Sequence, residues 1–170
     1  MRLVMLEAAD GAVLCVEQDI IEQSGTIRNI LTDVGATDKP IPVPNVSGHT
    51  LGRIIEYCRH HRSDPSRRRP RAPLQPDETN ASEAVTRQAI SQMDDFDHDF
   101  CRVDQGTLFD LILAANYLDI PPLLDLVGYT VASKMKGKSI QELRDTFGVK
   151  NDFTPEEEQQ ALNDNAWCEK

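Results

Sequence analysis

The chain of 170 residues lacks any apolar stretch long enough to cross a membrane, and only 5% of its residues are aromatic. Its longest stretch without a charge, residues 40–52, contains three prolines, whereas a membrane-spanning helix needs about 20 consecutive apolar residues. The apolar run at residues 3–6 is too short for the central region of a signal peptide. These absences predict no membrane partner and a location in the cytoplasm and nucleus.

The sequence also lacks the spacings that build metal and catalytic sites. Its four cysteines stand singly, without a Cys-x-x-Cys pair, and are expected to be reduced thiols. No EF-hand loop, glycine-rich phosphate loop or His-Glu-x-x-His motif occurs. The densest polar run, residues 94–99, could hold a divalent cation, but such runs are usually solvated, and we interpret it as the acidic end of a loop. We likewise interpret His60 and His61 as a solvated helix end. The sequence therefore predicts no catalytic residue, no metal site and no cofactor.

Charge is abundant but unevenly distributed. The formal net charge is −10, yet residues 59–71 contain six arginines and one acid. Residues 63–92 are rich in Arg, Pro, Ser and Thr and poor in bulky apolar residues, which predicts a disordered insertion. The arginines could serve as a nuclear import signal or contact phosphates, but the acidic remainder of the chain would repel a polyanion. We therefore expect protein partners and no nucleic acid.

The first third of the chain predicts a small sheet with helices. Apolar runs at residues 3–6 and 12–16 flank Asp10-Gly11, which indicates a β-hairpin. Residues 19–34 have helical spacing with a break near Ser24-Gly25, and residues 41–43, between prolines, suit an edge strand. The next helix is indicated by apolar positions at i, i+3, i+4 and i+7, namely Leu51, Ile54, Ile55 and Cys58.

The chain after the insertion is predicted to be helical. Helices are expected at residues 105–119 and from Pro121 to about Lys136. Capping boxes at residues 139–142 and 154–157 predict two further helices. The fold class is thus α+β. The helix at residues 105–119 is apolar on nearly every side, so it must be covered on both sides. A small domain covers only one side, which leaves the other for a partner. The alternative is that the whole helix lies inside the domain.

Several stretches are similar to a known family. They are residues 103–109 continuing into 111–120, residues 42–46, residues 150–154, and the closing residues 165–169. Together they closely resemble the S-phase kinase-associated adaptors of SCF (Skp–cullin–F-box) ubiquitin ligases. The resemblance implies a BTB/POZ-type domain followed by helices that bind the F-box of a substrate receptor. It also implies a non-catalytic adaptor that links this receptor to a cullin for ubiquitin-dependent degradation. An elongin C-like adaptor shares the domain but lacks the long C-terminal extension.

The resemblance further implies a division of the chain and of its binding residues. Residues 1–62 and 93–137 are the expected cullin-binding domain, 63–92 the insertion, and 138–170 the F-box-binding extension. Asn116 and Tyr117 are the expected cullin contacts. The expected F-box contacts are Phe109, Ile112, Leu113, Leu123, Leu124, Val127, Phe147, Phe153 and Trp167. Some relatives carry a hydroxylated and then glycosylated proline at the position of Pro155. The sequence leaves open that modification, a homodimer of the free protein, and the identity of the F-box partners.

Overall fold

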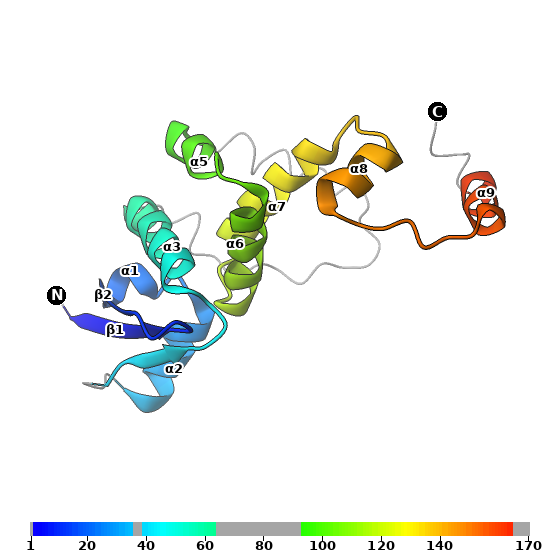
Figure 1. Cartoon of the computed structure of the whole chain (residues 1–170). Coiled ribbons are helices and arrows are strands. Elements are labelled where there is room, and N and C mark those ends of the chain that lie inside the picture. Colours follow the sequence, from blue (N-terminus) through cyan, green and yellow to red (C-terminus); the bar gives the residue numbers. More distant parts are fainter. Residues whose placement is uncertain (1, 36–38, 64–92, 165–170) are drawn as a thin grey trace. The chain divides into compact units, whose positions relative to one another are not determined.

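The computed structural model describes residues 2–35, 39–63 and 93–164, which divide into two compact units at residues 133 and 134 (Figure 1). The boundary expected from the sequence, between residues 137 and 138, lies four residues further along the chain. The predicted insertion at residues 63–92 lies outside the described residues, except for Ser63. Trp167 lies outside them as well.

The first unit begins with the predicted hairpin. Strands β1 (Leu3–Ala8) and β2 (Val13–Glu17) pair antiparallel across a turn that contains Gly11 at φ 79°, in the left-handed region that glycine adopts without strain. Strand β3 (Ile41–Val43) pairs in parallel with β1, and the strand order is β2-β1-β3. The predicted edge strand is confirmed, and its position tolerates Pro42, which has no N–H to donate to a ladder.

The hairpin turn is tied to the start of helix α3 (Gly48–His60). The Asp10 carboxylate accepts hydrogen bonds from the backbone N–H of Gly48 at 3.0 Å and of Ala12 at 3.1 Å. These bonds, with that from Gly48 the stronger, hold the pKa of Asp10 below its usual value. A Cβ atom at Gly48 would lie only 2.8 Å from the Cβ of Ala12, so this close approach requires glycine.

Two helices connect β2 to β3. They are α1 (Gln18–Ile21) and α2 (Gly25–Val34), and they are separated at the break that the sequence predicts. Ser24 causes the break because it is the N-cap of α2. Its backbone is extended, and its side chain accepts a hydrogen bond from the N–H of Ile27.

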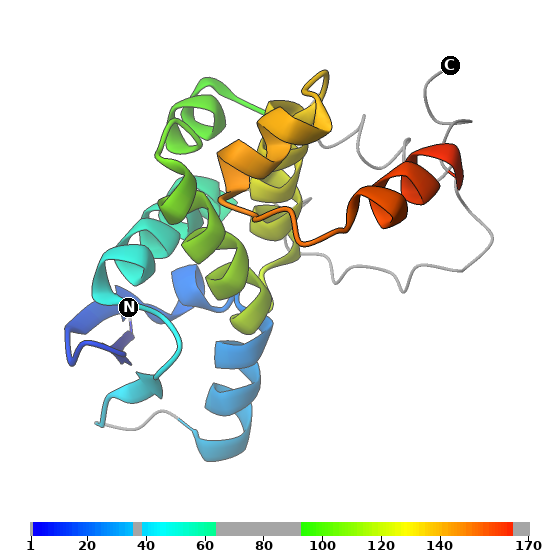
Figure 2. The ribbon, with the colours of Figure 1, turned by 45° about the vertical axis from the view of Figure 1, so that its right-hand side comes forward.

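Helix α3 is central to the core of the first unit. It packs against β1, β2 and the later helix α6 (Gln105–Tyr117), and Figures 1 and 2 show α3 and α6 side by side. The four apolar positions predicted to face the core are all buried, which confirms the helical spacing: Leu51, Ile54, Ile55 and Cys58. Burial raises the pKa of the Cys58 thiol to about 12, so this cysteine has no thiolate to offer as a nucleophile.

The remaining helices of the first unit are η1 (His61–Ser63), α5 (Asp95–Phe100) and most of α7 (Pro121–Met135). Helix α6 ends two residues before the predicted boundary, since Asp119 has a φ of 51° and cannot continue a right-handed helix. Among the helices of the described ranges, none is both long and apolar enough to cross a bilayer.

The second unit contains α8 (Ile140–Phe147) and α9 (Pro155–Asp164), both at the predicted capping boxes. Ser139 accepts a hydrogen bond from the N–H of Glu142, whose carboxylate accepts one from the N–H of Ser139 at 2.7 Å. Thr154 and Glu157 make the same reciprocal pair at the start of α9.

Candidate functional site

Helix α6 carries exposed apolar side chains on the side that faces away from the core. Its start is fixed by Asp104, whose carboxylate accepts hydrogen bonds from the hydroxyl of Thr107 at 2.7 Å and from its N–H at 3.0 Å, and both bonds lower the pKa of Asp104. One face of the helix is buried: Leu108, Leu111, Ala114 and Ala115. On the other side Phe109 is 37% exposed and Leu113 is 67% exposed.

The six residues of the first unit that were expected to contact an F-box fall into three groups. Phe109 and Leu113 are exposed, and Ile112 and Leu124 are half-buried. Leu123 and Val127 are completely buried in the core, so the prediction that these two residues form part of a binding surface is wrong. Periodicity could not separate them from Leu124, because α7 begins with apolar residues on nearly every side.

The two expected cullin contacts lie at the end of α6. Asn116 is exposed and Tyr117 is half-buried. The Tyr117 carbonyl accepts a hydrogen bond from the hydroxyl of Thr26 at 2.9 Å, and the Asp119 carbonyl accepts one from the N–H of Gly25 at 2.9 Å. The end of α6 is therefore docked on the start of α2, which holds Asn116 and Tyr117 in fixed positions.

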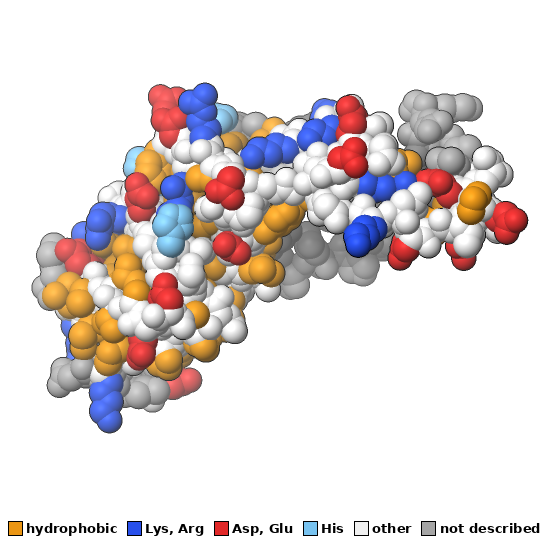
Figure 3. All heavy atoms as spheres, in the orientation of Figure 1, with side chains coloured by type: hydrophobic (Ala, Val, Ile, Leu, Met, Phe, Trp, Pro, Cys, Tyr) orange, Lys and Arg blue, Asp and Glu red, His pale blue; other side chains and the backbone are white. Residues whose placement is uncertain are grey.

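A second exposed apolar surface lies on the outer face of the hairpin, where Figure 3 shows hydrophobic side chains gathered over β1 and β2. Alternation along β1 buries Val4 and Leu6 and turns Leu3 outward, where it is 65% exposed. Val13 on β2 is 50% exposed. No F-box contact is expected on this face, so Leu3 provides a reference of nearly equal exposure for Leu113.

The second unit has no core of its own among the described side chains of residues 134–164. None of them is buried, and large apolar groups are exposed: Met135, Ile140, Val149 and Phe153. Of the expected F-box contacts here, Phe147 is half-buried and Phe153 is 52% exposed. Pro155 is the exposed first residue of α9.

Polar contacts link the two helices of this unit. Arg144 on α8 donates to the Glu158 carboxylate on α9 at 2.9 Å, and Asn151 donates to the same carboxylate at 3.2 Å. These bonds, that from Arg144 first, lower the pKa of Glu158. Exposed ion pairs and helix caps stabilise a unit only weakly, and no described side chain of residues 134–164 is buried to add to them.

The structure also brings together polar residues that the sequence analysis treated as solvated. The acidic run is helix α5, not a loop end, and Asp97 within it is completely buried. His61 is buried too, and its Nε2 lies 2.8 Å from the Asp97 carboxylate. The interpretation of both as solvated residues is therefore wrong. The sequence did contain a signal, since Phe96 and Phe100 are spaced for one helix face behind the N-capping residue Asp94.

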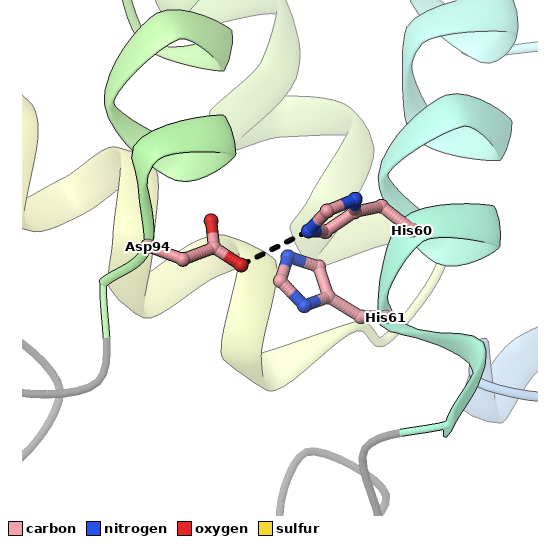
Figure 4. Close-up of side chains that lie close together, drawn as sticks. All are labelled: His60, His61 and Asp94. Atoms are coloured by element: carbon pink, nitrogen blue, oxygen red, sulfur yellow. Dashed lines mark hydrogen bonds and ion pairs between the residues drawn. The ribbon is translucent and has the colours of Figure 1, made fainter.

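Three side chains of this cluster converge at the junction of α3, η1 and α5 (Figure 4). His60 Nε2 lies 2.9 Å from the Asp94 carboxylate, and the His60 ring stacks on Phe96 with a centroid distance of 3.9 Å. Partial burial would by itself raise the pKa of Asp94. The hydrogen bonds from the Asp97 N–H and from His60 outweigh this effect, and the pKa of Asp94 is lowered.

Comparisons with known proteins agree with this architecture. Residues 2–63 match the family model described as "Skp1 family, tetramerisation domain", and residues 121–168 match "Skp1 family, dimerisation domain". These matches define the class of protein as a POZ-type α+β domain followed by a helical extension. The α+β fold expected from the sequence is confirmed.

Relatives match over nearly the whole chain. The "SCF ubiquitin ligase complex protein SKP1a" of Dictyostelium discoideum is 47% identical over 169 residues, which cover 99% of this chain and 97% of that protein. The "E3 ubiquitin ligase complex SCF subunit sconC" of Talaromyces stipitatus is 43% identical, with 98% and 96% covered. The "Skp1-related protein" of Caenorhabditis elegans is 43% identical, with 99% and 92% covered. The chain belongs to the Skp1 family.

Proposed function

We propose that this chain is the non-catalytic adaptor subunit of an SCF-type E3 ubiquitin ligase, in which it joins an F-box protein to a cullin in the cytoplasm and nucleus. Two of the relatives above are named as SCF proteins, and the matches cover 97% and 96% of their lengths. The observation that carries the proposal is the exposure of Phe109 and Leu113 on α6, because large apolar side chains presented together on a rigid helix suit a protein partner.

Each unit would contribute to the F-box interface through its own exposed apolar groups. In the first unit these are Phe109 and Leu113, with half-buried Ile112 and Leu124 beside them. In the second unit Phe153 is exposed, with half-buried Phe147 beside it in the proposal. Trp167 belongs to the same proposal by resemblance. When no F-box protein is bound, these apolar groups are available to a second copy of the chain.

The cullin contact is assigned to Asn116 and Tyr117. A half-buried tyrosine at a helix end combines a large apolar ring with a hydroxyl, which is typical of residues that dominate binding energy at interfaces. The docking of this helix end on α2 fixes the backbone at Tyr117 before a partner arrives.

Replacing Tyr117 by lysine tests this division of the surface. We expect Tyr117→Lys to weaken cullin binding about thirtyfold, or about 2 kcal/mol, because the ring is lost and a charge is placed in the interface. F-box binding should stay within about twofold of the unchanged chain. Both affinities are measured by calorimetry with an isolated cullin N-terminal domain and an isolated F-box domain. Tyr117→Phe is the matched control and should bind both partners. Equal losses for both partners with Tyr117→Lys would contradict the assignment.

The second unit is expected to be ordered by its partner. In the free chain the amides of α9 (Pro155–Asp164) should exchange quickly, since no described side chain there is buried to stabilise the helix. Binding of an F-box domain should slow this exchange at least tenfold, because apolar groups become covered. Hydrogen–deuterium exchange with mass spectrometry measures both states. Helix α3, whose core positions are buried, is the internal reference and should be protected throughout. Slow exchange of α9 in the free chain would contradict the expectation.

A further inference from the structure

Two histidines and one aspartate lie close enough to share a metal ion. One ligand atom from each of His60, His61 and Asp94 lies within 4.8 Å of the other two. Figure 4 shows the His61 ring beside the hydrogen bond that joins His60 to Asp94, with one ring nitrogen turned toward the carboxylate. We propose that His60, His61 and Asp94 bind one divalent transition-metal ion of the zinc class.

The distances require only a small adjustment. Zinc binds imidazole nitrogen and carboxylate oxygen at about 2.0–2.2 Å, so two ligands of a tetrahedral site lie about 3.4 Å apart. His60 Nε2 and the Asp94 carboxylate lie 2.9 Å apart, about 0.5 Å closer than this spacing. Both side chains are nearly half exposed, which lets them move about 1 Å toward the buried His61. Three protein ligands leave the fourth position for water.

The surroundings hold the ligands in place before the ion arrives. Asp97 is completely buried, and its carboxylate lies 2.8 Å from His61 Nε2, so it holds the ring at this junction until the ion takes the place of the hydrogen on that nitrogen. The stacking of His60 on Phe96 restricts the other ring. The carboxylate of Asp94 is fixed by the N–H of Asp97 at 2.8 Å. Such preorganisation reduces the entropy lost on binding.

The charges and the ligand types favour a transition metal. Asp94 and Asp97 bring two negative charges close together, and a divalent cation would neutralise them. Two arginines adjoin the histidines in sequence, Arg59 and Arg62, and Arg62 is paired with Glu17 and Asp19, so its charge is balanced away from the cluster. Imidazole nitrogen suits zinc, copper and nickel, whereas magnesium and calcium prefer an all-oxygen shell.

Binding exchanges a proton for the metal. The ion takes the place of the hydrogen between Nε2 of His60 and the Asp94 carboxylate, and the neutral ring keeps its remaining proton on Nδ1. The displaced proton passes to solvent. The bound ion would connect η1 to α5, and these two elements flank residues 64–92 in the sequence.

Calorimetric titration of the full chain with zinc chloride, after treatment with a chelator, tests the site. We expect one ion per chain and a rise of about 5 °C in Tm when free zinc is a hundredfold above its Kd. His60→Ala and Asp94→Asn should each weaken binding about tenfold to a hundredfold. Asn is as good an N-cap as Asp, so the second variant keeps the start of α5. The matched control is His98→Ala, an exposed histidine of α5 outside the cluster.

Two further measurements exclude other outcomes. Cobalt(II) should give the visible absorption bands of a tetrahedral site with the unchanged chain and with His98→Ala, and these bands should be lost in His60→Ala. Magnesium and calcium should not raise Tm. The proposal is overturned if the chain takes up no zinc, if the three variants bind equally, or if magnesium gives the same shift as zinc. Circular dichroism confirms that each variant is folded.

Discussion

Leu113→Asp is expected to weaken binding of an F-box domain about a hundredfold, which corresponds to about 2.7 kcal/mol. Leu113 is 67% exposed on α6, so the substitution removes no core contact and should leave the fold intact. In the complex the same position would be covered, and a carboxylate there would lose its hydration without gaining a partner. Surface plasmon resonance or calorimetry with an isolated F-box domain measures the effect.

Leu3→Asp is the matched control for this experiment. Leu3 is 65% exposed on the outer face of the hairpin, so the two variants introduce the same charge at positions of nearly equal exposure. Leu3→Asp should bind the F-box domain normally, and Leu113→Asp should keep its cullin binding. If both substitutions reduce F-box binding equally, or neither does, α6 is not the docking helix and the assignment of Phe109 and Leu113 fails with it.

Asp97→Ala should lower the free energy of unfolding by about 3–5 kcal/mol, the largest stability effect that we expect from one polar residue of this chain. Asp97 is completely buried, and its loss would leave His61 buried beside an empty space without its hydrogen-bond partner. It would also remove half of the capping box of α5, because the Asp97 carboxylate accepts a hydrogen bond from the N–H of Asp94. Urea unfolding followed by circular dichroism measures the change.

Asp99→Ala, two residues further along the same helix, is the reference for Asp97→Ala. Its side chain is 76% exposed and pairs with Arg102 at 3.4 Å, so the free energy of unfolding should change by no more than about 0.5 kcal/mol. Asp97→Asn keeps the shape and one acceptor oxygen, and should therefore fall between the two. Equal stability of the Asp97 and Asp99 alanine variants would show that the buried pair contributes nothing.

The same buried pair explains how α5 is fixed to the first unit. His60 forms a hydrogen bond with Asp94, and His61 forms one with Asp97. Arg53 on α3 donates to the Phe100 carbonyl at 2.7 Å, and its guanidinium lies over the Phe100 ring. Each of these contacts joins α3 or η1 to α5. Residues on both sides of the segment 64–92 are thus held by side chains, whatever the length of the chain between them.

The secondary structure of this protein was largely determined by local sequence. Ser139 with Glu142, and Thr154 with Glu157, start helices because their side chains satisfy backbone N–H groups only three residues away. The spacing of Leu51, Ile54, Ile55 and Cys58 placed one face of α3 in the core because a helix with that pattern has one apolar side. The hairpin, the break before Gly25 and the edge position of β3 follow in the same way from turn residues and prolines.

Tertiary structure alone decided which apolar and polar residues are covered. Leu123 and Leu124 are neighbours on a helix that is apolar on most sides, and only the packing of the first unit buries the first and leaves the second half-exposed. His61 and Asp97 are 36 residues apart, so no local pattern could pair them. The spacing of apolar residues shows which sides of a single helix are apolar. The burial of a given side chain depends on elements that come into contact only when the whole chain has folded.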